Sequence, residues 1–124
     1  MGSPHQSGWT RISTPSGRYE YQFQGKVPTV RNANYEEATD YQFLVMDAEG
    51  WLYRIPVRVA AQAEAVLRES GQTEIAAEVI RLAESQLRAG LQKYVPRQNA
   101  PYEELDRSFS VDATRAREIL RQST

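Results

Sequence analysis

Carboxylates are the residues whose type and spacing could carry out chemistry in this chain of 124 residues. They form two clusters: Glu36, Glu37 and Asp40, and then Glu103, Glu104 and Asp106. Paired carboxyl groups can act as general acid and base when burial separates their pKa values, and clustered carboxylates can bind a hard cation. Both clusters lie in polar loops beside short predicted helical turns, one at Asn34–Ala38 and one after Pro101, where the helix dipole favours acids. We therefore predict no catalytic residue, no metal site and no cofactor, and keep a carboxylate-dependent enzyme as an alternative.

Histidine and cysteine chemistry is almost excluded by the sequence. His5 is the only histidine, and the chain has no cysteine. Disulfides, thiolate zinc sites and a cysteine nucleophile are therefore impossible, and a Ser–His dyad has no histidine within the predicted fold. The seven glycines are scattered and form no phosphate-binding loop. The enzyme hypothesis rests on the carboxylates alone.

Basic residues are nearly all arginine and are balanced by acids. The 15 basic and 16 acidic residues give a net charge of −1, which argues against a broad nucleic-acid surface. Nucleic-acid binding is kept as an alternative that would use Arg54, Arg58 and the arginines of the last predicted helix. The latter are Arg107, Arg115, Arg117 and Arg121.

A hairpin over residues 41–58 is the clearest element that could position a site. Its turn is "DAEG", in which Asp47 can accept a local backbone hydrogen bond and Gly50 can adopt a left-handed conformation. This turn places Val45 opposite Tyr53, Phe43 opposite Ile55 and Tyr41 opposite Val57. All six side chains are apolar or aromatic and share one face, which we predict to line the core. Pro56 has no backbone N–H to donate to a neighbouring strand. Its strand should therefore lie at an edge of the sheet, or its pairing should end at this residue.

The remaining elements complete an α+β fold. Tyr19, Tyr21 and Phe23 alternate with polar residues and predict a strand, which a turn at 15–17 joins to a short strand before it. Residues 25–40 are predicted to form a loop. Helices are predicted at 59–70 and at about 73–94, forming a helical hairpin, and at 111–122, where Ser110 would be the N-cap. We expect an antiparallel sheet of three to four strands, with the helical hairpin and the C-terminal helix packed on it. Residues 9–124 would form a single domain after a disordered leader, residues 1–8.

The second face of the 41–58 hairpin is the candidate site. It is apolar near the turn and basic further away, and its predicted partner-binding residues are Leu44, Met46, Trp51, Leu52, Arg54 and Arg58. Enrichment in Met, aromatic residues and Arg, with few Lys, is typical of protein interfaces. Either the last helix or the 25–40 loop could instead cover this face. We predict a small non-enzymatic interaction module, of adaptor, chaperone or inhibitor type, which binds a protein partner or itself as a homodimer. No apolar run is long enough to span a membrane, and we expect a soluble cytoplasmic protein without membrane partners.

Overall fold

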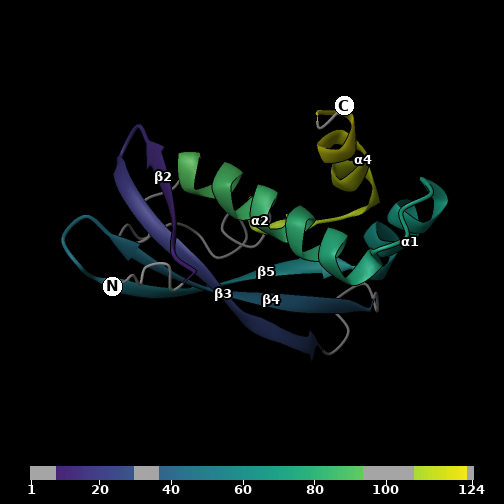
Figure 1. Ribbon diagram of the computed structural model, residues 1–124, viewed down its shortest axis with the longest axis horizontal. Helices are drawn as coiled ribbons and strands as arrows, with labels where there is room; N and C mark the ends of the chain where they lie inside the picture. Colours follow the sequence, from purple (N-terminus) through teal and green to yellow (C-terminus); the bar gives the residue numbers. More distant parts are fainter. Residues whose placement is uncertain (1–7, 30–36, 94–107, 123–124) are drawn as a thin grey trace.

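The computed structural model describes residues 8–29, 37–93 and 108–122, and it has the predicted α+β architecture (Figure 1). The predicted leader therefore lies outside the described residues except for Gly8. The strands are β2 (Thr10–Thr14), β3 (Gly17–Thr29), β4 (Ala38–Asp47), β5 (Leu52–Ala60) and β6 (Ser110–Val111). The helices are α1 (Ala61–Glu69), α2 (Ile75–Lys93) and α4 (Ala113–Gln122).

The sheet is mixed and contains five strands in the order β2-β3-β4-β5-β6. The strands from β2 to β5 form an antiparallel meander, whereas β6 pairs in parallel with the end of β5, through Arg58 and Val59. The expectation of a purely antiparallel sheet of three to four strands is therefore wrong. Parallel strands need a long crossover connection, usually helical, and α1 and α2 lie between β5 and β6 in the chain. β6 is too short to show any alternation in the sequence.

The β4–β5 hairpin has the predicted register. Val45 pairs with Tyr53, Phe43 with Ile55 and Tyr41 with Val57. The turn also forms as expected. The Oδ1 atom of Asp47 accepts the backbone N–H of Glu49 at 2.9 Å, and Gly50 has a φ of 91°.

The predicted core face of the sheet packs against the helices. Tyr41, Phe43, Val45 and Val57 are buried, and the apolar stripes of α1 and α2 are buried with them. The sheet curls, so that β2 and the first part of β3 rise beside α2 (Figure 1). The expected helical hairpin is matched only in part, because α1 packs mainly against α4.

Two boundaries differ from the predictions for local reasons. Residues 25–29 belong to β3 rather than to a loop, because an irregularity between Phe23 and Gly25 absorbs the extra residue and pairing then continues to Thr29. The last helix begins after Asp112, whose Oδ1 atom accepts the N–H of Arg115 at 2.8 Å. Ser110, the predicted cap, is instead part of β6.

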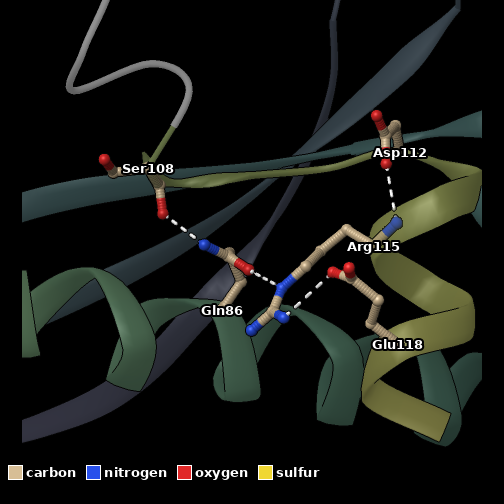
Figure 2. Close-up of polar contacts among 5 residues, drawn as sticks. All are labelled: Gln86, Ser108, Asp112, Arg115 and Glu118. Atoms are coloured by element: carbon tan, nitrogen blue, oxygen red, sulfur yellow. Dashed lines mark hydrogen bonds and ion pairs between the residues drawn. The ribbon is translucent and has the colours of Figure 1, made fainter. Parts of the chain in front are cut away.

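A buried polar side chain joins α2 to the C-terminal elements. The amide of Gln86 donates to the backbone carbonyl of Ser108, and its Oε1 atom accepts the Nε–H of Arg115 at 2.6 Å (Figure 2). Arg115 also pairs with Glu118 at 3.3 Å. The amide nitrogen and the amide oxygen of Gln86 therefore both have a hydrogen-bond partner, as the polar atoms of buried side chains usually do. None of the helices in the described ranges is long and apolar enough to cross a membrane.

Candidate functional site: the outer face of the β4–β5 hairpin

The outer face of β4 and β5 lies on the side of the sheet away from the helices. In Figure 1, α1, α2 and α4 all lie on one side of β4 and β5. α4 packs against α1, α2 and β6, so the last helix does not cover the outer face. Of the predicted 25–40 loop, residues 25–29 and 38–40 are strand, and residues 30–36 lie outside the described part of the chain.

Three apolar side chains meet on this face beside an arginine. Met46 pairs with Leu52 across the ladder, and Leu44 pairs with Arg54. Leu52 is 57% exposed, and Leu44 and Met46 are half-buried between their neighbours. We call these four residues, Leu44, Met46, Leu52 and Arg54, the outer patch. The structure thus brings together four of the six predicted partner-binding residues.

Trp51 lies beside the outer patch but belongs to the other face. Its carbonyl accepts the N–H of Asp47 at 3.0 Å, so the ladder alternation extends to this residue. Side chains two apart share a face, which places Trp51 with Tyr53 on the side that carries the helices. Trp51 is 61% exposed there, at the end of the sheet.

The two predicted basic residues have different surroundings. Arg58 donates from Nε to Asp40 Oδ1 at 3.0 Å, across the β4–β5 ladder. This ion pair is half-buried, so the charge of Arg58 is already engaged by Asp40. Arg54 is exposed and has no ion-pair partner in the part of the chain that the structure describes. Arg54 is therefore the cation that this face offers to a ligand.

The backbone edge of β5 beside the patch is open. In an antiparallel ladder, alternate residues direct their N–H and C=O groups away from the partner strand. The N–H of Arg58 points away from β4, because it donates to the carbonyl of Phe109 at 2.9 Å. Pro56, Arg54 and Leu52 stand at every second position before Arg58, so their backbone groups point away from β4 as well. β6 pairs only with Arg58 and Val59. The edge groups of Leu52 and Arg54 thus have no partner among the described residues.

Of the six carboxylates that suggested enzyme chemistry, the two that the structure describes do not form a site. Asp40 pairs with Arg58, and Glu37 is exposed. Glu36 and the second cluster, Glu103, Glu104 and Asp106, lie outside the described residues. No group of acids or histidines within the described ranges could hold a metal ion.

A buried phenol is the most perturbed titratable group, and its role is structural. Tyr21 donates from its hydroxyl to Glu84 Oε2 at 2.6 Å and accepts from Arg88 at 3.0 Å. Burial, together with the carboxylate of Glu84, raises the pKa of Tyr21 to about 12. This cluster ties β3 to α2, and its phenol stays protonated at neutral pH. This cluster could not be predicted from the sequence, because alternation along β3 says nothing about which groups the hydroxyl of Tyr21 contacts.

The arginines proposed for nucleic-acid binding do not share one surface. Arg115 is drawn toward Gln86, and it lines a shallow hollow with Glu118, Arg121 and Gln122. This hollow lies on the helical side of the sheet, whereas Arg54 lies on the outer face. Arg107 is outside the described residues.

No family model, no curated protein and no solved structure matches this chain. Its function must therefore be inferred from its own residues and their geometry.

Proposed function

We propose that this chain is a non-enzymatic interaction module that binds a protein partner, or a second copy of itself, through the outer patch. The supporting observation is a face of the β4–β5 hairpin that none of the described helices covers, on which Leu44, Met46 and Leu52 are adjacent. Single exposed apolar residues are ordinary on proteins, but contiguous ones mark interaction sites.

The composition of the patch favours a protein as the ligand. Met is adaptable, and an arginine beside apolar groups is enriched in interfaces. Among the described residues of β4 and β5, Arg54 is the only arginine without an ion pair, and one cation is a weak anchor for a phosphate backbone, which needs several. A neighbouring protein surface would cover the apolar side chains and leave Arg54 at the rim.

The test places a photo-reactive residue beside the patch without changing it. Gln22 pairs with Leu44 in the ladder and points to the same face. With Gln22→p-benzoylphenylalanine, irradiation in the cells that make the protein should give one dominant adduct, identified by mass spectrometry. The same probe at Ala77, an exposed position on α2, should not give it.

A double variant then shows whether the patch itself holds the partner. Met46→Glu with Leu52→Lys should abolish the adduct, because desolvating a charge at an interface is costly. The two new charges face each other across the ladder and form a favourable pair in the free protein, so circular dichroism should show an unchanged fold. Ala76→Lys with Ala77→Glu adds the same charges to the exposed surface of α2 and should leave the adduct intact.

Three results would contradict the proposal. One is an adduct that survives the patch variant, and another is an equal adduct from the Ala77 probe. The third is unfolding of Met46→Glu with Leu52→Lys, which would show that the outer face is packed as core.

A further inference from the structure

We propose that two copies of this chain join edge to edge through β5. This inference goes beyond the proposed function and uses another surface of the same hairpin, because the joint is made by the backbone edge of β5 and leaves Leu44 and Met46 of β4 uncovered. It starts from the edge of β5, where the backbone groups of Leu52 and Arg54 that point away from β4 have no partner among the described residues. An open strand edge is a template for another strand.

The two ends of this open edge are closed by residues that cannot donate. Pro56 has no N–H, and the N–H of Gly50 is already bonded to the carbonyl of Asp47 at 3.0 Å. A strand that pairs with this edge must therefore form its backbone hydrogen bonds with Leu52 and Arg54, and it must not need an N–H donor from Pro56 or Gly50. A second β5 in antiparallel orientation meets this condition in one register.

In that register, Leu52 pairs with Arg54 of the other copy, and Tyr53 faces its own equivalent across the two-fold axis. Each free N–H of Leu52 and Arg54 then meets a free carbonyl, and each free carbonyl meets an N–H. Pro56 falls opposite Gly50 of the other copy, where neither residue has a donor to offer.

The neighbouring registers fail on backbone bonding or on charge. Centring the axis on Arg54 would place two arginines directly opposite each other, which is unfavourable, and would pair Leu52 with Pro56, leaving a carbonyl without a donor. Centring it on Leu52 would pair Arg54 with Gly50, whose N–H is already used. The donor pattern of one edge thus selects a single symmetric register.

The side chains agree with the same register. On the face that carries the helices, Trp51 would lie opposite Ile55 of the other copy, and Tyr53 opposite Tyr53. Trp51 is 61% exposed, and Tyr53 and Ile55 are half-buried, so their contact across the joint would remove apolar surface from water. A foreign strand would share the backbone bonds, but nothing on this edge selects its side chains.

The opposite edge of the sheet, β2, is occupied at one position. The carbonyl of Ser13 in β2 accepts a hydrogen bond from the side chain of Gln92 in α2 at 3.3 Å. No described side chain is bonded in this way to the outward backbone groups of Leu52 and Arg54.

Cysteine substitutions test the register directly, since the natural chain has no cysteine and every disulfide must join two copies. Tyr53→Cys should cross-link rapidly under mild oxidation, because facing residues on antiparallel strands lie within disulfide range. Ile55→Cys and Trp51→Cys alone should not, since their equivalents lie four residues apart along the strand, about 13 Å. An equimolar mixture of these two variants should form the mixed disulfide.

Backbone variants test the ladder in the full chain. Light scattering should show a monomer that becomes a dimer across a hundredfold rise in concentration. Arg54→Pro removes an edge N–H that the monomer does not use, and it should stay monomeric at every concentration. Arg54→Ala keeps the N–H and should still dimerise.

The inference is overturned if the chain is monomeric throughout, or if Tyr53→Cys cross-links no faster than the more exposed Trp51→Cys. It is also overturned if Arg54→Pro, folded by circular dichroism, still dimerises.

Discussion

Phe43 shows at the scale of one residue how the sheet separates core from surface. It is 2% exposed, and its ring contacts those of Tyr21 and Phe23 at centroid distances of 6.1 and 5.6 Å. Phe43→Ala should lower the free energy of unfolding by about 3–5 kcal/mol, because it opens a cavity among aromatic rings. Gln42, the next residue, points to the outer face and is the matched control. Gln42→Ala should cost about 0.5 kcal/mol or less.

Urea titrations of both variants measure these two losses. Comparable values at Phe43 and Gln42 would show that the two faces of β4 are not distinguished in solution. The contrast is informative because the positions are adjacent and belong to the same strand.

The β4–β5 turn is the element whose geometry depends most on one backbone conformation. Gly50 has a φ of 91°, and a Cβ placed on it would meet no atom within 4 Å. A side chain there would cost backbone strain alone. Gly50→Val should therefore destabilise the protein by about 1–3 kcal/mol, whereas Ala48→Val, in the same turn, should cost much less.

Thermal unfolding followed by circular dichroism compares these turn variants. Gly50→Asn is a useful third variant, because Asn tolerates the left-handed region better than Val and should fall between the two. Equal melting temperatures for Gly50→Val and Ala48→Val would mean that the turn tolerates another conformation.

Elements were predictable from the sequence where their pattern is local. The hairpin register follows from four turn residues and from alternation on both strands, so it could be predicted without the fold. The extension of β3 through Gly25 and Pro28 was missed, because both residues are loop signals and the irregularity that accommodates them depends on β4. Both β6 and the Gln86–Arg115 bond depend on contacts between residues distant in the chain, for which the sequence offers no periodicity.

The candidate site was predictable in part for the same reason. Alternation correctly grouped Leu44, Met46, Leu52 and Arg54, because they belong to one hairpin. Trp51 was grouped with them from its place at the turn, although the ladder assigns it to the other face. The open edge could not be seen in the sequence, since it depends on where β6 stops.

At the scale of the whole molecule, the C-terminal elements are held to the rest by a close contact between Phe109 and α2. The ring of Phe109 packs where Gly90 has no side chain, and a Cβ at Gly90 would lie 2.7 Å or less from three of its ring carbons. Gly90→Ala would ordinarily stabilise a helix interior by about 1 kcal/mol. Here it should destabilise the protein by about 1–3 kcal/mol, because both groups are buried and neither has room to move.

A double-mutant cycle separates this clash from other effects. In the background of Phe109→Ala, the same Gly90→Ala change should be neutral or stabilising by up to about 1 kcal/mol. If Gly90→Ala is equally destabilising in both backgrounds, by urea unfolding, the Phe109 contact is not its cause.

The parallel pairing of β6 with β5 has a consequence for how the chain folds. The strands from β2 to β5 follow one another closely along the chain, whereas Val59 and its partner Val111 are separated by 52 positions. Loop closure costs conformational entropy that rises with the number of residues enclosed, and such long-range contacts form slowly. The meander can assemble from near neighbours, so we expect the sheet to gain its fifth strand last, after α1 and α2 have shortened the path between the two ends.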